Sequence, residues 1–228
     1  MSEPVRFQTT SDNSLLLRFG DSLNSGVHRQ VRKLLHLLGT APIRAVTNLH
    51  PAYCSILFDF DALRITHADL ELVLRDYLRR SGALQLAEPR TIEIPACYDG
   101  EFAPDLAEVA QLRSLTPSRV IELHSSAVYT VYFLGFVPGF AYLGEVPAEL
   151  ATPRRASPRA KVPPGSIGIA DSQTGIYPFA TPGGWQLIGR TPLTLFQPWR
   201  DSMSMLNVGD RVRFAPISSS EFAKIQSK

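Results

Sequence analysis

The sequence predicts an α+β protein in two parts: a small N-terminal α/β sandwich-like domain, residues 1–85, and a β-barrel domain, residues 86–228. The first part alternates strand-like and helix-like patterns, which is typical of a small α+β domain. The second part is rich in turn-forming residues. From Pro138 to Pro192 the chain holds nine of its 18 prolines and eight of its 15 glycines. Such a segment cannot be helical, and it favours short strands between fixed turns, as in a barrel.

The N-terminal part contains four strand patterns and two helix patterns. The strands are expected at residues 5–10, 14–19, 43–49 and 53–60. Apolar residues at helical spacing predict a helix over residues 23–38. A second helix is expected over residues 66–80, with Thr66 as its N-cap. Residues 81–90 then form the expected domain boundary.

The C-terminal part begins with a strand, continues with two short helices and ends in strands and turns. The strands are expected at residues 90–99, 127–136, 166–170, 175–180, 185–191, 193–196 and 208–217. The helices are expected over residues 103–113 and 116–126, the latter with Thr116 as N-cap and Pro117 in its first turn. The last twelve residues are expected to form a short helix or a tail.

Composition excludes several classes of protein. The formal net charge of +2 is too small to indicate a nucleic-acid-binding protein. Cys54 and Cys97 lie far apart without a CxxC motif, so neither a disulfide framework nor a zinc site is indicated, and Cys54 is expected to be a reduced core thiol. The N-terminus does not resemble a secretory signal, and no apolar run approaches the roughly 20 residues of a membrane span. We therefore expect a cytoplasmic protein without a nucleic-acid or membrane partner.

A basic loop is the strongest local signal of a binding site. Arg154, Arg155, Arg159 and Lys161 place four positive charges within eight residues, with no acid among them. Prolines at positions 153, 158 and 163 stiffen the loop that carries them. A stiff arginine loses less entropy on binding, and its guanidinium can hold a carboxylate or a phosphate through two parallel hydrogen bonds. The alternative interpretation is a solvated basic loop.

A double glycine followed by a tryptophan forms the second signal. Gly183 and Gly184 allow backbone N–H groups to point together into an anion nest, and Trp185 offers a flat face for a ring. The alternative is a glycine turn beside a core tryptophan. The segment is not a P-loop, because the GxxxxGK[ST] pattern is absent.

His124 is the only histidine in the second half of the chain. Its place near the C-terminal end of a predicted helix favours the protonated form. The alternative is a packing or capping role. Asp171 and Tyr177 are polar groups of the strand-and-turn region that can orient other residues, and no Ser-His-Asp motif or carboxylate pair emerges.

Residues 133–147 combine four aromatic residues, three glycines and two prolines with one charged residue, Glu145. Aromatic side chains favour burial, whereas glycine and proline interrupt the helices and strands that usually bury them. The segment is therefore expected to hold apolar rings on irregular backbone.

Three segments, residues 124–144, 153–170 and 174–191, together closely resemble the 5-oxoprolinase B-subunit family, also called the allophanate hydrolase subunit 1 or kinase A inhibitor family. The resemblance implies a cyclophilin-like β-barrel after the N-terminal domain. It also implies a protein that works with the C and A subunits of 5-oxoprolinase in the ATP-dependent conversion of 5-oxoproline to glutamate. Pro164 and Gly168 depart from the family's usual loop pattern.

With this resemblance, we interpret Phe136, Phe140 and Tyr142 as one wall of a cleft, with Pro138 and Gly139 forming the turn. The basic loop and the glycine turn are expected to form other walls. Apolar sides with a few fixed cations suit a small ring carrying a carboxylate, or a nucleotide. Phosphorylation of the amide oxygen helps to open an unstrained lactam, and cations stabilise the phosphoryl charge.

The site is therefore expected to contain catalytic residues, binding residues and no metal ligand. The catalytic candidates are His124, Arg154 and Arg159, and the substrate- or anion-binding candidates are Phe136, Phe140, Tyr142, Arg155, Lys161, Ser166, Tyr177, Gly183, Gly184 and Trp185. ATP and Mg²⁺ are expected to be shared with the complex, because the sequence contains neither an ATP motif nor a carboxylate cluster. The alternatives are a regulatory protein that inhibits a sensor histidine kinase and, by fold analogy alone, a prolyl isomerase.

Overall fold

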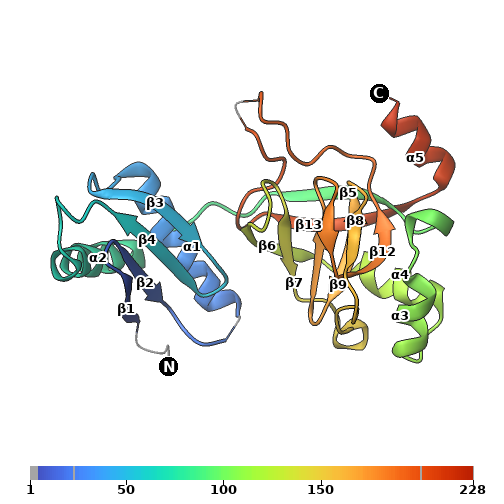
Figure 1. Cartoon of the computed structure of the whole chain (residues 1–228), viewed down its shortest axis with the longest axis horizontal. Coiled ribbons are helices and arrows are strands. Elements are labelled where there is room, and N and C mark those ends of the chain that lie inside the picture. The colour runs from blue at the N-terminus through green and yellow to red at the C-terminus, as the bar shows by residue number, and fades with distance from the viewer. Residues whose placement is uncertain (1–4, 23, 201, 228) are drawn as a thin grey trace. The chain divides into compact units, whose positions relative to one another are not determined.

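The structure is a computed structural model that describes residues 5–22, 24–200 and 202–227. The chain divides into two compact units, Met1–Glu88 and Pro89–Lys228 (Figure 1). Together they have the α+β fold class that the sequence predicts, with a closed barrel in the second unit. That each unit is an independently folding domain, with a boundary after residue 85, stays a prediction.

The described residues of the first unit form a four-stranded antiparallel sheet and two helices. Its elements are β1 (Arg6–Ser11), β2 (Ser14–Arg18), α1 (Ser25–Thr40), β3 (Val46–Pro51), β4 (Ser55–Phe60) and α2 (His67–Gly82). The strand order is β1-β2-β4-β3. In the central pair, Leu15 lies opposite Phe58 and Leu17 opposite Ile56, and these buried side chains pack with the apolar residues of both helices. The sandwich-like layering follows from this shared core.

The helices begin where capping residues accept backbone hydrogen bonds. Asn24 Oδ1 accepts from the Val27 N–H at 2.8 Å, so α1 begins at Ser25; Leu23, where the predicted range began, lies outside the described residues. Thr66 Oγ1 accepts from the Asp69 N–H at 3.2 Å, which confirms the predicted N-cap of α2.

The second unit contains a closed barrel of seven strands and a separate two-stranded sheet. The strands are β5 (Thr91–Cys97), β6 (Tyr129–Leu134), β7 (Ala141–Gly144), β8 (Arg159–Val162), β9 (Ser166–Ala170), β10 (Gln173–Ile176), β11 (Thr181–Gly183), β12 (Gln186–Arg190) and β13 (Arg211–Ile217). The barrel order is β10-β7-β6-β13-β5-β12-β9, and β11 pairs with β8. All barrel pairs are antiparallel except β5 with β13, which are parallel.

In the described part of the second unit, three α-helices accompany the barrel. They are α3 (Leu106–Leu112), α4 (Pro117–Ser126) and α5 (Ser219–Gln226), and short 3₁₀ turns occur at η1 (Gly100–Phe102) and η2 (Ala148–Leu150). Thr116 caps α4 with Pro117 in its first turn, as predicted, and a capping box at Ser218 starts α5. Apolar residues of α3 and α4 share one core with the barrel strands. In the described part of the chain, no helix is both long enough and apolar enough to cross a bilayer.

The sequence misplaced several short strands of the barrel region. Residues 193–196 form no strand, and Phe196 makes only an isolated bridge with Ser204. The strand predicted at 175–180 ends at Ile176, two residues before a proline that cannot donate to a β-ladder. Conversely, β7, β8 and β11 lie in segments that were interpreted as loops or turns. The strand character of β8 and β11 depends on their pairing with each other across about 20 residues, whereas β7 pairs with the preceding strand β6 and with β10.

Cys54 is a free cysteine, but the prediction that it lies in the core was wrong. Its side chain is only partly buried, and the residue lies just before β4. The fully buried free thiol is Cys97, at the end of β5.

Candidate functional site

The fold brings the basic loop and the glycine turn together. Strands β8 and β11 pair so that Arg159 lies opposite Gly183, and the Arg155 N–H donates to the Gly184 carbonyl at 2.8 Å. Pro158 also lies beside Gly184, where a Cβ would be 3.6 Å from its ring. Two sequence segments that were interpreted separately therefore form one local structure.

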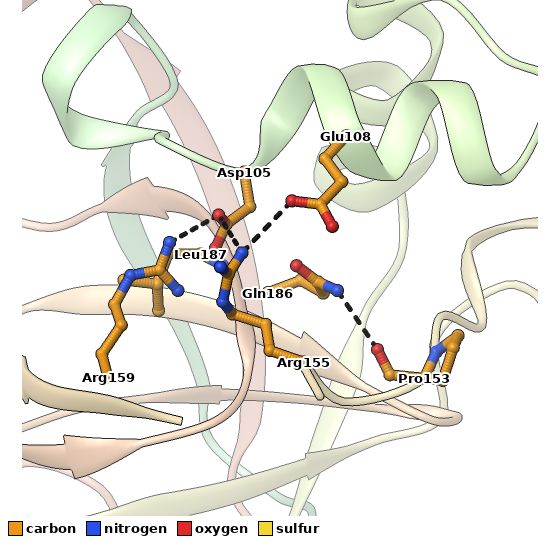
Figure 2. A network of polar contacts seen from close by, with 7 residues as sticks. All are labelled: Asp105, Glu108, Pro153, Arg155, Arg159, Gln186 and Leu187. Atoms are coloured by element: carbon orange, nitrogen blue, oxygen red, sulfur yellow. Dashed lines mark hydrogen bonds and ion pairs between the residues drawn. The ribbon is translucent and has the colours of Figure 1, made fainter. Parts of the chain in front are cut away.

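Asp105, at the start of α3, is the centre of the polar contacts of this structure (Figure 2). Its side chain is only 3% exposed. Its Oδ1 accepts hydrogen bonds from Arg155 Nη1 at 3.0 Å and from Arg159 Nη2 at 2.6 Å. Its Oδ2 accepts from the Leu187 N–H at 2.6 Å, and its own N–H donates to the Leu187 carbonyl at 2.9 Å. One buried carboxylate thus joins α3, β12 and both arginines.

Glu108 and Gln186 extend this network. Glu108 Oε2 lies 3.2 Å from Arg155 Nη1, and Gln186 Nε2 donates to the Pro153 carbonyl at 3.3 Å. The basic segment contains no acid in its own sequence, but the fold places two acidic side chains against it. The acids come from α3, about fifty residues earlier, because tertiary contacts place that helix against the loop.

Arg154 and Lys161 differ from the two engaged arginines. The side chain of Arg154 is 60% exposed, and its Nε lies 3.9 Å from Asp171 Oδ2, a long and solvated ion pair. Lys161 is exposed on β8. Of the four predicted cations, these two are placed to meet a ligand from solvent.

The predicted aromatic residues gather in a cluster of rings that meet mostly edge to face. Phe140 lies 4.7 Å from Tyr142, 5.0 Å from Tyr177 and 5.5 Å from Trp185, measured between ring centroids. Phe140, Tyr177 and Trp185 are buried, Tyr142 is half-buried, and Phe136 is exposed, with its ring 5.6 Å from Phe140. Phe140, Tyr177 and Trp185 therefore belong to a packed core cluster, and of the five rings only Tyr142 and Phe136 offer surface to solvent.

The turn that carries Phe140 has the predicted glycine. Gly139 has a φ of +80°, and a Cβ there would lie 2.7 Å from Phe196 Cβ. Only glycine fits both the backbone conformation and the space.

Two tyrosine hydroxyls lie within electrostatic range of Arg154. Burial raises the pKa of the Tyr177 phenol to about 12, while a hydrogen bond with the Trp185 backbone and the charges of Arg154 and Arg159 act in the opposite direction. Burial also raises the pKa of Tyr142, and the charge of Arg154 again opposes this. Both phenols are therefore neutral near pH 7 and can donate a hydrogen bond beside a cation.

The remaining binding candidates have mainly structural surroundings. A Cβ on Gly183 would lie 2.5 Å from the Tyr177 hydroxyl, so glycine is required for close packing at that position. Ser166 is 3% exposed at the start of β9, and its backbone carbonyl accepts from the Tyr177 N–H at 2.9 Å. That Gly183 and Gly184 form an anion nest stays a prediction.

His124 lies in the barrel core rather than with the basic loop. Its side chain is fully buried and stacks on Phe214 with ring centroids 4.5 Å apart. Thr174 Oγ1 donates to the Gly168 carbonyl at 3.0 Å and must therefore accept from His124 Nε2, also at 3.0 Å. The Nδ1 lone pair then accepts from the Tyr98 hydroxyl at 2.8 Å.

Both ring nitrogens of His124 are therefore satisfied in the neutral form. Burial lowers the pKa of this imidazole to about 3. The prediction of a protonated His124 was wrong, because desolvation outweighs the favourable field of a helix end. The contacts that the structure gives His124 are those of a core residue, and a catalytic role for it stays a prediction.

Sequence reasoning missed Asp105 and Gln186. Neither residue belongs to the motifs around the loop and the turn, and neither carries a local signature of ligand binding. The one available signal was the position of Asp105 at the start of a predicted helix, where an acid is ordinary and indicates only a helix N-terminus.

Comparison with known proteins places this fold and loop arrangement in a defined class. A family model described as the carboxyltransferase domain, subdomain C and D, matches residues 5–206. The B subunit of 5-oxoprolinase from Bacillus subtilis (strain 168) is 40% identical over 232 residues, which cover 96% of each chain. The B subunit of 5-oxoprolinase from Escherichia coli O157:H7 is 57% identical over 143 residues, covering 63% of this chain and 65% of that protein.

A solved structure of TTHA0988 has a TM-score of 0.80 and 36% identity. The match covers 90% of this chain and 40% of the TTHA0988 chain. The chain therefore belongs to the carboxyltransferase subdomain C and D family and, within it, to the 5-oxoprolinase B-subunit family.

The pH dependence of unfolding should report the buried His124. The unfolded chain, with an ordinary histidine pKa near 6.5, takes up a proton as the pH falls below that value, whereas the folded imidazole stays neutral until about pH 3. The free energy of unfolding should therefore fall by about 2 kcal/mol between pH 7.5 and pH 5.

Tryptophan fluorescence reports denaturation of the second unit, because Trp185 and Trp199 both lie there, and His124 is the one histidine in that unit's sequence. His124→Gln should abolish the pH dependence. A free energy of unfolding that stays constant from pH 7.5 to pH 5 in the wild type would contradict the buried neutral imidazole.

Gly183→Ala should destabilise the second unit by roughly 1–3 kcal/mol, because the new methyl group overlaps the Tyr177 hydroxyl. Gly184→Ala is the matched control, since its Cβ would have no neighbour closer than 3.6 Å, and it should stay within about 1 kcal/mol of the wild type. Denaturation followed by tryptophan fluorescence compares the two. Equal effects of the two substitutions would show that the contact with Tyr177 is not tight.

Proposed function

We propose that the chain is the B subunit of an ATP-dependent 5-oxoprolinase that converts 5-oxoproline to glutamate together with the A and C subunits. The observation that carries the proposal is the 40% identity to the B subunit of a 5-oxoprolinase over 96% of both chains. Agreement over nearly the whole length includes both compact units, not the motif-rich segments alone. The name of that relative also favours an enzymatic role over inhibition of a histidine kinase.

The local chemistry suits one part of this reaction. 5-Oxoproline is a small ring with a carboxylate, Arg154 is an exposed cation within electrostatic range of Tyr142 and Tyr177, and Lys161 is an exposed cation on β8. Arg154 can bind the carboxylate or stabilise a transferring phosphoryl group. The half-buried ring of Tyr142 and the exposed ring of Phe136 offer apolar contact to the remainder of the ligand.

The chain is proposed to depend on its partners for nucleotide and metal. Among the described residues, no group of three or more His, Cys, Asp or Glu side chains is arranged to hold a metal ion. These residues do not fit a resident Mg²⁺, so we place Mg²⁺ and the main ATP site with the partner proteins. Arg155 and Arg159 are engaged by Asp105, which makes Arg154 the leading catalytic candidate.

Reconstitution tests the proposal directly. The purified chain, mixed with the A and C subunits, should form glutamate from 5-oxoproline and ATP, and omission of any one of the three proteins should abolish the reaction. The isolated chain should form little or no glutamate. A complete mixture that assembles but forms no glutamate would refute the proposed function, and turnover by the chain alone would refute its dependence on partners.

Within the reconstituted complex, Arg154→Ala should lower kcat/KM by roughly 30- to 1,000-fold, the scale expected for loss of one preorganised charge contact of about 2–4 kcal/mol. Arg119→Ala is the matched control, because Arg119 is another exposed arginine of the second unit. Among the ion pairs of the described residues, Arg119 pairs only with the exposed Glu122 on its own helix, α4. The control should retain near-normal activity. Equal activity of the Arg154→Ala and Arg119→Ala complexes would leave Arg154 as solvated surface.

A further inference from the structure

We propose that Asp105 is a positioning residue: its buried carboxylate fixes the basic loop so that Arg154 is presented beside Tyr142 and Tyr177. The proposal rests on the proposed function for its catalytic consequence. The geometric part depends only on the contacts of the loop, and the two parts are tested separately below.

The position of Asp105 is fixed by hydrogen bonds to a barrel strand. Its N–H and its Oδ2 form a pair of hydrogen bonds with the backbone of Leu187, which lies in barrel strand β12. Its position is therefore set by the barrel and not by the loop. The carboxylate's other oxygen, Oδ1, then remains for the two guanidinium groups.

The loop is fixed on both sides of Arg154. The preceding Pro153 carbonyl accepts from Gln186 Nε2. The following residue, Arg155, is held by Asp105 through its side chain and by the Gly184 carbonyl through its N–H. Arg154 is thus an exposed side chain on a backbone that is fastened immediately before and after it. Such an arginine is preorganised for an anion, because less motion is lost on binding.

The charge of Asp105 matters as well as its shape. Arg155 and Arg159 are only about a quarter exposed, so each of them needs a nearby negative charge. Asparagine has a similar size but no charge. Its terminal NH₂ group would face N–H donors, because both oxygens of Asp105 accept hydrogen bonds from N–H groups. Asp105→Asn should therefore release Arg155 and Arg159, and with them the backbone of the loop.

Trypsin tests the release without any enzymatic assay. The protease must take an arginine side chain into its own pocket, so the bonds Arg155–Ala156 and Arg159–Ala160 should be protected while Asp105 holds both side chains. Asp105→Asn should speed cleavage at these two bonds by at least about tenfold, since local opening becomes easier. Mass spectrometry identifies the cut sites, and a melting curve shows that the variant is folded at the temperature used.

Glu108→Gln is the matched control. It removes a carboxylate from the same Arg155 Nη1, but Glu108 is 52% exposed, so the loss should matter little. Cleavage after Arg155 and Arg159 should stay close to the wild-type rate. If both variants are cut alike, or if folded Asp105→Asn is cut like the wild type, the positioning role is overturned.

The kinetic test uses the reconstituted complex. Asp105→Asn should lower kcat/KM by at least about tenfold through misplacement of Arg154, and the KM for 5-oxoproline or ATP should rise. A loss of folded protein alone would lower the rate but leave KM unchanged. In an Arg154→Ala background the effect of Asp105→Asn should largely disappear, because the residue through which it acts is already gone.

If the wild-type complex forms no glutamate, the proposed function fails. The trypsin result still tests whether Asp105 fixes the loop.

If Asp105→Asn does not fold, Arg159→Lys replaces it, since lysine keeps the charge but loses the guanidinium fork. This variant should also speed tryptic cleavage of the loop and raise KM. Unchanged cleavage and unchanged KM in a folded variant would overturn the proposal.

Discussion

The pairing of one buried carboxylate with two guanidinium groups determines the arrangement of the candidate site. A carboxylate that is 3% exposed is stable as an anion only when its oxygens are hydrogen-bonded and its charge is compensated. Asp105 meets both conditions by joining α3, strand β12 and the basic loop. The loop in turn lies against the glycine turn through the β8–β11 pairing. Loop, turn and helix are therefore one structural unit.

This arrangement divides the four cations of the loop between two tasks. Arg155 and Arg159 face the protein and hold the loop, whereas Arg154 and Lys161 face solvent. The loop's sequence alone does not show which of its cations hold the loop and which face solvent. Only the tertiary contacts distinguish the two groups. The phenols of Tyr142 and Tyr177 lie within electrostatic range of Arg154 and are neutral near pH 7, since burial raises their pKa values further above the ordinary value of a phenol. A fixed cation next to neutral donors and aromatic rings suits a small anionic ring.

Local patterns predicted the parts of the fold that local interactions control. The caps Thr66 and Thr116 and the apolar spacing of the helices are properties of neighbouring residues, and they were predicted correctly. Strand β11 and the role of Asp105 depend on partners 20 to 80 residues away, so the sequence pattern did not contain them. The state of His124 was misjudged for the same reason, since its burial by Phe214 and the barrel core is a tertiary effect.

A double-mutant cycle between Asp105 and Arg159 tests the central interaction most directly. The free energy of unfolding of the second unit is measured by tryptophan fluorescence for the wild type, Asp105→Asn, Arg159→Met and the double variant. Because the two side chains meet at 2.6 Å and are largely buried, the coupling free energy should be about 1–3 kcal/mol. A coupling below about 0.5 kcal/mol, with all four proteins folded, would contradict the account.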